Sequence, residues 1–296
     1  METEDEISLE YKRGNATLRS STHTLTYSKT RKVAAPPQVC KVFPIALKRR
    51  EILEYDIHTY NFTLAITRIL ISLNPDLVGS FPTIETSHRT TELSVFPKLE
   101  YFYVPPYSLR VKRPAERQID HASESLTSGI SNDDSFMSLF DSFVLQVVLP
   151  YMKRRLHTLG MIQDLHTPMT FYYQRPPTLR IQPGPSTQSV MLHRDGDYGH
   201  QEGELNFWFP LTDRTLTQTE LWVESQPDEG DYTPVEVNIG QVSVFHGTSC
   251  RHYVPPNKTR YTRVSLDFRV GVQDYFDPHW KMRGTKDDHF RRTIEY

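Results

Sequence analysis

Four residues in the last third of the chain have the types and spacing of a metal site beside an anion-binding side chain. His193 and Asp195 are two residues apart, His252 follows 57 residues after Asp195, and Arg263 follows 11 residues after His252. Two histidines and one carboxylate can hold a redox metal on one face and leave the opposite face open. An arginine can pair with a carboxylate through two hydrogen bonds. The set predicts a metal centre that works with an acidic co-substrate.

The first part of this set has a rival in the same segment. With 12 histidines and 36 acidic residues among 296, about 1.5 His-x-Asp or His-x-Glu triplets are expected by chance, and the chain has two. The triplet His193 to Asp195 ends an apolar run with strand character, whereas the triplet His200 to Glu202 lies in a glycine-flanked loop. We favour the first because a strand end holds a ligand more rigidly.

The second histidine has a rival too. His246 precedes Arg260 by 14 residues, much as His252 precedes Arg263 by 11. Residues 261–270 alternate as a strand, with Val264, Leu266, Phe268 and Val270 on one face and Arg263, Ser265, Asp267 and Arg269 on the other. An arginine inside a β core needs a partner for its charge, and a bound dicarboxylate would be one. We therefore favour His252 with Arg263, because Arg260 lies at the strand entrance.

The composition is that of an ordinary globular chain. Its formal net charge of −2 and sequence pI near 6.6 give no electrostatic argument for nucleic acid or an anionic membrane, so small-molecule or peptide substrates are expected. Two cysteines, Cys40 and Cys250, are too few for a disulfide scaffold. The acidic N-terminus has no apolar signal-like segment. A cytoplasmic location with free thiols is the expectation, and the oligomeric state is left open.

The first 165 residues are expected to form a helical and loop region that packs on the core and covers the site. A short extended run is predicted at 39–47 and a helix from Glu51, where apolar residues recur at helical spacing. Residues 74–116 have the proline, threonine and aromatic content of loops and edge strands. A second helix is predicted from Asp134, capped by Asp133 or by Asp134, and ended or kinked at Pro150.

Residues 166–275 are expected to form the core, followed by a C-terminal extension at 276–296. Short runs separated by turn residues predict about eight strands, at 169–174, 178–182, 189–193, 204–212, 220–224, 233–237, 241–246 and 261–270. This pattern favours a mainly β fold with flanking helices. Its core would be a double-stranded β-helix, a cupin-like jelly roll with a cleft between its sheets.

Four segments of this core carry a family resemblance: Gln174–Pro185, Leu192–Thr212, Leu221–Gly247 and Arg251–Val270. They resemble the iron(II)- and 2-oxoglutarate-dependent dioxygenases, in particular the StrG-like and phytanoyl-CoA hydroxylase-like groups. The resemblance covers about residues 165–272. It implies Fe(II), 2-oxoglutarate and O2 as metal, co-substrate and oxidant.

The resemblance also implies roles for individual residues. His193, Asp195 and His252 match the iron ligands, Arg263 matches the anchor for the distal carboxylate of 2-oxoglutarate, and Ser265 matches the hydroxyl beside that anchor. Further candidates are Asn206 as a hydrogen-bond donor to the co-substrate or a structural amide, and Trp222, Glu224, Arg180 and Trp208 as substrate contacts, with Trp208 as a wall of the cavity. A surface salt bridge is the alternative for Arg180.

The function implied is an oxygenase that most simply hydroxylates a small natural-product or amino-acid-like molecule and releases succinate and CO2. The carboxylate of Asp195 argues against a halogenating variant, whereas desaturation, ring closure and epimerisation are left open. A 2-oxoglutarate-dependent protein hydroxylase and a non-redox, cupin-like metal-binding protein are the alternatives.

Overall fold

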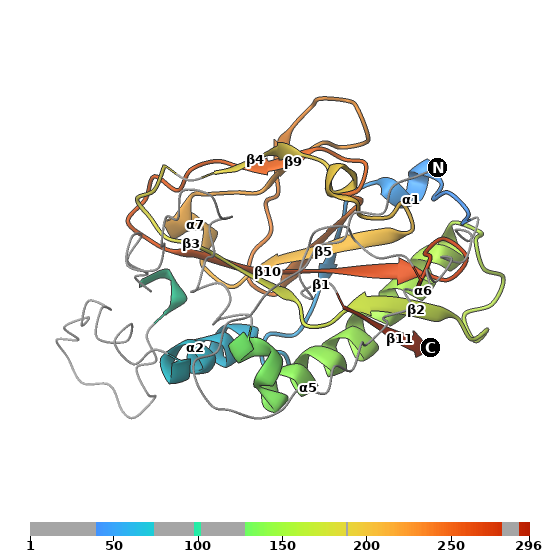
Figure 1. Cartoon of the computed structure of the whole chain (residues 1–296), viewed down its shortest axis with the longest axis horizontal. Helices are drawn as coiled ribbons and strands as arrows, with labels where there is room; N and C mark the ends of the chain where they lie inside the picture. Colours follow the sequence, from blue (N-terminus) through green and yellow to red (C-terminus); the bar gives the residue numbers. More distant parts are fainter. Residues whose placement is uncertain (1–39, 74–97, 102–127, 188, 280–289) are drawn as a thin grey trace, which may run out of the picture. The chain divides into compact units, whose positions relative to one another are not determined.

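Two antiparallel sheets and a layer of helices make up the part of the protein described by a computed structural model, shown in Figure 1. The structure describes residues 40–73, 98–101, 128–187, 189–279 and 290–296. The chain divides into two units, Met1–Pro36 and Pro37–Tyr296, and all described residues belong to the second. The observed class is mixed α/β, with more helix than a mainly β fold implies.

The larger sheet has seven strands and is centred on the longest one. Its order is β1 (Glu51–Glu54), β8 (Gln241–Phe245), β5 (Glu204–Pro210), β10 (Arg263–Val272), β2 (Thr170–Gln174) and β11 (Arg291–Glu295). β3 (Thr178–Gln182) pairs with the first half of β10, and β2 pairs with its last three residues. β10 is therefore paired along its whole length, and all ten of its residues are buried.

The smaller sheet has four short strands, in the order β4 (Val190–His193), β9 (His252–Val254), β6 (Trp222–Val223) and β7 (Thr233–Pro234). In Figure 1, β4 and β9 lie on one side of β5 and β10, and the long helices lie on the other side. A small apolar cluster contains side chains from both sheets, including Trp208, Phe245, Val223 and Val254. The two sheets therefore pack against each other through these side chains.

The helices cover the other face of the larger sheet. α2 (Phe62–Leu73) lies beside a long helical run formed by α5 (Asp134–Phe143), a π-helical turn η2 (Val144–Val148) and α6 (Leu149–Thr158). By length and apolar composition, the run from Asp134 to Thr158 could cross a membrane, but its largest apolar side chains are buried in the main core. The rings of Phe140 and of Phe268 in β10 form a T-shaped pair, with centroids 5.0 Å apart.

The start of α5 and the position of Pro150 in the helical run have local explanations. Asp133 is the N-cap, because its side chain accepts a hydrogen bond from the amide of Phe136, as expected. The helical run is not ended by Pro150, which lies in the first turn of α6 directly after the π-helical turn η2. The π-turn η2 immediately before Pro150 absorbs the change in hydrogen-bond register.

Alternate residues of the central strands face different layers. Leu205, Phe207 and Phe209 of β5 belong to the main core under the helices, whereas Trp208 belongs to the small cluster between the sheets. β10 follows the same rule, with its valine, leucine and phenylalanine side chains in the main core. The polar residues of both strands consequently face the space between the sheets.

Two predictions for the N-terminal part are wrong. The segment from Glu51 begins as strand β1 rather than a helix, because Leu53 is buried opposite Val242 of β8, and the helix starts only at Phe62. Sheet pairing here overrides the helical spacing of the apolar residues. The extended run predicted at 39–47 contains a short helix, α1 (Ile45–Lys48).

Three further observations concern the predicted boundaries. Strands β9 and β11 were not expected, because His252–Val254 is short and Arg291–Glu295 follows a polar segment. The loops expected at 74–116 lie mostly outside the described residues, except for the single turn η1 (Leu99–Tyr101). The division at residues 165 and 275 stays a prediction, and so does the covering role of residues 1–165.

Candidate metal centre and its cavity

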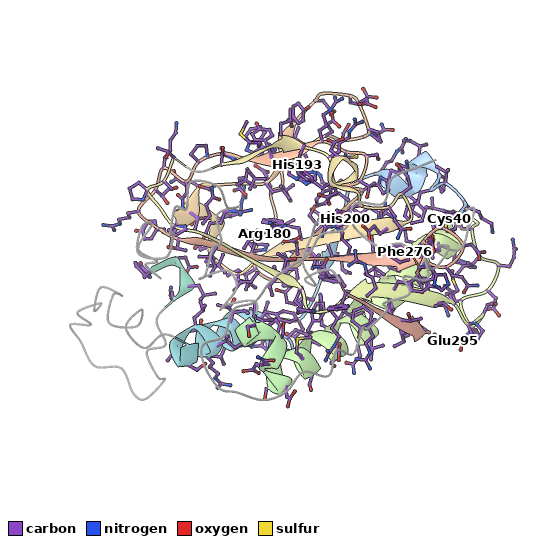
Figure 2. All side chains as sticks on the ribbon, viewed as in Figure 1. Cys40, Arg180, His193, His200, Phe276 and Glu295 are labelled. Atoms are coloured by element: carbon purple, nitrogen blue, oxygen red, sulfur yellow. The ribbon has the colours of Figure 1, made fainter. Side chains whose placement is uncertain are left out.

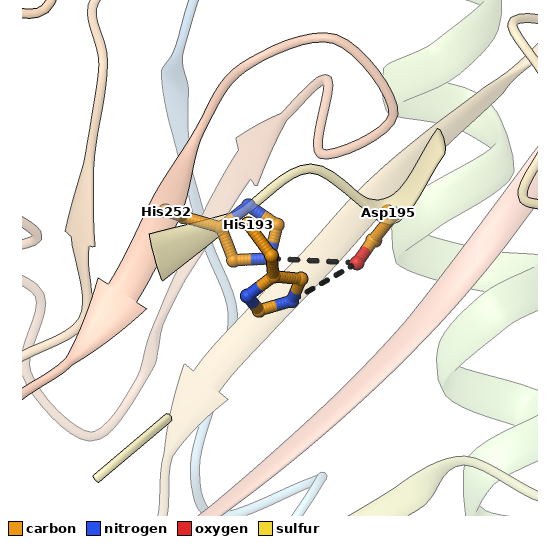
Figure 3. Close-up of side chains that lie close together, drawn as sticks. All are labelled: His193, Asp195 and His252. Carbon is orange, nitrogen blue, oxygen red and sulfur yellow. Dashed lines mark ion pairs between the residues drawn. The ribbon is translucent and has the colours of Figure 1, made fainter. Parts of the chain in front are cut away.

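His193, Asp195 and His252 lie together at the edge of the smaller sheet, as Figure 3 shows. His193 ends β4 and is the direct cross-strand partner of His252, the first residue of β9. Asp195 begins the short 3-10 helix η3 (Asp195–Tyr198) that follows β4. One side-chain donor atom from each residue lies within 4.8 Å of the other two. The three residues form a compact, facial-triad-like cluster.

Each histidine presents the same ring nitrogen to this cluster. His193 Nδ1 lies 2.6 Å from the carbonyl oxygen of Met191, and His252 Nδ1 lies 3.0 Å from that of Cys250. A carbonyl oxygen only accepts hydrogen bonds, so both Nδ1 atoms carry the proton. In the neutral form of each ring this leaves the Nε2 lone pair for a metal, and the two Nε2 atoms face Asp195 Oδ1 at 3.7 and 3.5 Å. This is how metal-binding histidines are held in one tautomer.

The two oxygens of Asp195 have different partners. Oδ2 accepts hydrogen bonds from Asn206 Nδ2 at 2.7 Å and from Arg269 Nη2 at 2.8 Å, whereas Oδ1 faces the histidines. Burial opposes ionisation of this carboxyl, but Arg269 and the two histidines outweigh it and hold its pKa well below the ordinary value. Asp195 is therefore an anion with one oxygen fixed by the protein and one directed at the cluster.

A close backbone contact sets the position of Asp195. The Asp195 amide donates to the carbonyl of Gly247 at 2.9 Å, and the Gly247 amide donates to Asn206 Oδ1 at 3.3 Å. A Cβ atom at Gly247 would lie 2.6 Å from Asn206 Nδ2 and 2.8 Å from Asp195 Oδ2. The segment after β8 can approach the carboxylate this closely only because residue 247 has no side chain.

The rival histidines are engaged elsewhere. His246 is fully buried, with Nδ1 beside Ser249 Oγ and Nε2 2.8 Å from the carbonyl oxygen of Glu202. His200 Nδ1 lies 2.7 Å from Glu204 Oε1. Arg260, the partner proposed for His246, lies over the ring of Tyr261 near the protein surface. Among the described residues, the one group suited to a metal is His193, Asp195 and His252.

Arg263 and Ser265 bring unsatisfied polar atoms to the same space. Arg263 is only 6% exposed, and its guanidinium lies 5.1 Å from the centroid of the Trp208 ring. Its Nη2 and the Oγ of Ser265 are buried and have no hydrogen-bond partner among the described residues. Burial and, to a smaller degree, the charge of Arg180 lower the pKa of Arg263 to about 10, although Glu220 acts in the opposite direction. A carboxylate bound here would satisfy both atoms.

A cavity of about 390 Å³ is lined both by Arg263 and by the three residues of the metal cluster. Its size is at the lower end of the range for small-molecule sites, about 300–1,000 Å³. Apolar side chains from the cluster between the sheets form part of its wall. The polar lining includes the three residues of the metal cluster, Arg180 of β3, and Arg263 and Arg269 of β10. The lining includes His193, Asp195, His252, Asn206, Trp208, Arg180, Arg263, Asp267, Arg269, Leu221, Phe245 and Val254.

Arg180 combines its two predicted placements. It lines the cavity and also forms an ion pair, because its Nε and Nη2 donate to the two carboxylate oxygens of Asp267 at 2.8 and 3.3 Å. Its side chain is 49% exposed, so solvent still reaches the guanidinium. Figure 2 shows Arg180 near the centre of the larger sheet and His193 on the smaller one.

Trp222 and Glu224 lie outside the cavity lining. Trp222 stacks on Tyr253, its cross-strand neighbour, at 5.9 Å between ring centroids. Glu224 is fully buried and accepts hydrogen bonds from the backbone amide of Arg251 at 2.7 Å and from two amides of the 225–232 loop. Their role in substrate binding stays a prediction, and the contacts of Glu224 are those of a residue that fixes a loop.

Sequence reasoning placed Arg269 on the polar face of its strand but gave it no role. The structure shows that it binds Asp195 and also donates to Gln174 Oε1 at 3.2 Å. The alternation of the strand could have indicated a role for Arg269, because a second buried arginine on the polar face needs a second anion. Asn206 likewise contacts Asp195, and its proposed donation to a co-substrate stays a prediction.

Comparison with known proteins supports the resemblance predicted from the sequence. No family model matches the chain. A stretch of 108 residues is 36% identical to the streptomycin biosynthesis protein StrG of Streptomyces griseus. The match covers 36% of this chain and 50% of StrG, so the chain spans about half the length of this relative. Over this stretch, the chain is a homologue of StrG.

Solved structures give looser likenesses. The Ni complex of the non-heme monooxygenase ThoJ has a TM-score of 0.34 and 23% identity, covering 46% of this chain and 54% of ThoJ. The α-ketoglutarate-dependent epimerase SnoN from nogalamycin biosynthesis has a TM-score of 0.40 and 11% identity, covering 83% and 91%. The dioxygenase for auxin oxidation in rice has a TM-score of 0.41 and 14% identity, covering 85% and 83%. At these values, the chemistry of the site must be judged from its own side chains.

Proposed function

We propose that the protein is an Fe(II)- and 2-oxoglutarate-dependent oxygenase acting on a small molecule. The observation that carries this proposal is the pairing of two unlike sites in one cavity. Three side chains suited to a divalent metal line this cavity, and so does Arg263, whose buried Nη2 has no partner among the described residues. Ser265, with a similarly unpartnered Oγ, follows two residues later on the same face of β10. A metal site alone would not account for Arg263.

The donor set fits iron(II). Two neutral imidazoles and one carboxylate oxygen form the set typical of non-heme iron oxygenases, and they leave the remaining positions on one face open. Asp195 offers a single oxygen, because Arg269 and Asn206 hold the other. Bound Fe(II) would supply the redox chemistry that activates O2, which protein side chains cannot supply.

The second site fits the distal carboxylate of 2-oxoglutarate. Arg263 offers a planar donor pair, and Ser265, two residues along the same face of β10, offers a hydroxyl. Trp208 packs under the guanidinium and keeps water from that side. The oxidation would then take place in a partly apolar cavity, where the walls restrict side reactions with water.

Four finer features belong to the same proposal. We propose that the two sheets form a double-stranded β-helix, with His193, Asp195 and His252 at one end of it. The substrate is proposed to be a natural-product or amino-acid-like molecule, which the name of StrG supports by analogy alone. Hydroxylation with release of succinate and CO2 is the reaction class, and the cytoplasm is the proposed location.

The test is anaerobic addition of Fe(II) and 2-oxoglutarate to the metal-free protein. A visible charge-transfer band is expected, because 2-oxoglutarate that chelates Fe(II) absorbs visible light. Absence of the band in folded, iron-loaded protein would overturn the proposal and favour a non-redox metal site. Succinate release in air, measured over candidate small molecules and peptides, then separates a small-molecule enzyme from a protein hydroxylase.

The two histidines of the β8–β9 region provide a matched control. His252→Ala is expected to abolish iron binding and the band, because it removes one of three donors. His246→Ala is expected to keep both, since its ring nitrogens are engaged with Ser249 and Glu202. Folding of each variant is checked by circular dichroism, because His246 is fully buried. The opposite pattern would show that the wrong histidine has been assigned.

A further inference from the structure

Arg180 shares the cavity face with the candidate co-substrate anchor. In the β3–β10 ladder, Arg180 is the direct partner of Ser265. Cross-strand partners project to the same side of a sheet, so Arg180 faces the cavity together with Arg263, Ser265 and Asp267. This register places it beside the co-substrate site rather than on the helix side of the sheet.

The ion pair with Asp267 fixes the guanidinium without using all of it. Nε and Nη2 of Arg180 face the two oxygens of Asp267, which leaves Nη1 for a further acceptor. Asp267 is buried, whereas the Arg180 side chain is 49% exposed. A guanidinium held side-on by a buried carboxylate presents its remaining edge in one orientation.

The charges of the lining point to an anion. The cavity is lined by three arginines, Arg180, Arg263 and Arg269, and two aspartates, Asp195 and Asp267. Iron(II) adds two positive charges and 2-oxoglutarate adds two negative ones, so the loaded cavity keeps one positive charge in excess. Arg269 is occupied by Asp195, and Arg263 by the proposed co-substrate. Arg180 is itself paired with Asp267, so the excess belongs to the lining as a whole. Of the three arginines, Arg180 alone has an exposed side chain, so an entering anion can reach its guanidinium.

We propose that Arg180 binds an anionic oxygen group of the primary substrate, so that the substrate is a small organic acid. This inference rests on the proposed function. The anionic group, a carboxylate or a phosphate monoester, would contact Nη1 of Arg180. The uncharged part of the molecule would pack on Leu221, Phe245 and Val254, which line the same cavity. Arg180 is then a specificity-determining residue.

Calorimetric titration under anaerobic conditions tests this assignment. The protein is loaded with Fe(II) and saturating 2-oxoglutarate, and titrated with matched probes: benzoate, phenyl phosphate and benzamide, and the cyclohexyl counterparts of all three. At least one acid is expected to bind about tenfold or more tightly than its amide, because charge-assisted hydrogen bonds are the stronger ones. The two acid classes distinguish a carboxylate from a phosphate ligand.

Two variants show whether Arg180 carries the preference. Arg180→Gln is expected to remove the advantage of the acid over the amide, and Arg180→Lys to keep part of it. Arg292→Gln is the matched control, because Arg292 is also 49% exposed and pairs with Asp141 at 2.6 Å but does not line the cavity. It should behave as the wild type.

The outcomes separate this inference from the proposed function. Failure of the proposed function appears as absence of the charge-transfer band before any probe is added. With the band present, the assignment of Arg180 is overturned if no acid in the panel binds better than its amide, or if the preference survives Arg180→Gln. Retention of the band during the titration shows that the acid has not displaced 2-oxoglutarate.

Discussion

Replacing Arg263 with methionine is expected to make the ligand-free protein more stable. Burial lowers the pKa of Arg263 from 12.5 to about 10, which corresponds to about 3 kcal/mol of unfavourable free energy for the charged side chain in the fold. This unfavourable contribution is fully present below pH 10 and vanishes as the pH rises towards 12.5, because the folded-state pKa is the lower one. Loss of the cation–π contact between the guanidinium and the Trp208 ring destabilises the variant by about 0.5–2 kcal/mol. A net gain of about 1–2 kcal/mol is expected.

The same substitution at Arg269 should have the opposite sign. Arg269 is six residues further along β10, equally buried, and paired with Asp195 at 2.8 Å. Arg269→Met leaves the buried carboxylate of Asp195 without its cation, and breaking such a pair costs about 3–5 kcal/mol. The two substitutions thus change the free energy of unfolding in opposite directions. Arg269 is paired with an anion of the protein, whereas the proposed anion for Arg263 is a bound ligand.

Urea unfolding at pH 7, with a chelator and without 2-oxoglutarate, measures both free energies. The unfolding midpoints should rank Arg263→Met above the wild type and Arg269→Met below it. In the metal-loaded proteins, addition of 2-oxoglutarate should then raise the unfolding midpoint of the wild type. It should leave the midpoint of Arg263→Met almost unchanged. If Arg263→Met is less stable than the wild type, the guanidinium has a partner in the ligand-free fold and the reasoning fails.

Three further predictions concern the surroundings of the site. Ser265→Ala should change the unfolding free energy little, because its Oγ has no partner among the described residues, yet weaken 2-oxoglutarate binding in a charge-transfer titration; unchanged binding would remove Ser265 from the site. Gly247→Ala should weaken metal binding in a chelator competition, because the new Cβ would displace Asp195 and Asn206, and wild-type affinity would contradict this. Glu204 is buried, which opposes ionisation, but Arg291 and His200 lower its pKa from 4.5 to about 2. The stability it provides is present above pH 4.5 and lost as the pH falls towards 2, so urea midpoints of Glu204→Gln between pH 5 and pH 3 should fall less than those of the wild type.

Local patterns in the sequence were sufficient where a single element decides the outcome. Period-two alternation in 261–270 predicted which residues of β10 face the main core, and Asp133 was one of two candidates for the helix cap. Where pairing with a strand distant in sequence decides the secondary structure, local patterns did not predict it. Glu51–Glu54 has helical apolar spacing but forms a strand because β8 offers it an edge.

The partners of Asp195 were beyond reach for the same reason. Arg269 and Asp195 are far apart in sequence, and their contact depends on how the loop after β4 packs against β10. The alternation rule could place Arg269 on the correct face but could not choose its anion among several carboxylates. Long-range ion pairs of this kind follow from strand register, which short sequence windows do not contain.

The two halves of the site belong to different sheets. His193 and His252 are on β4 and β9 of the smaller sheet, whereas Arg263 and Ser265 are on β10 of the larger one. A co-substrate held by the metal at one end and by Arg263 at the other would tie the sheets together like a cross-link. Its departure would remove this link and leave the apolar cluster as the contact between the sheets. Amide hydrogen exchange in β4 and β9 should therefore be faster without 2-oxoglutarate than with it, so that the exchange rate reports occupancy of the site.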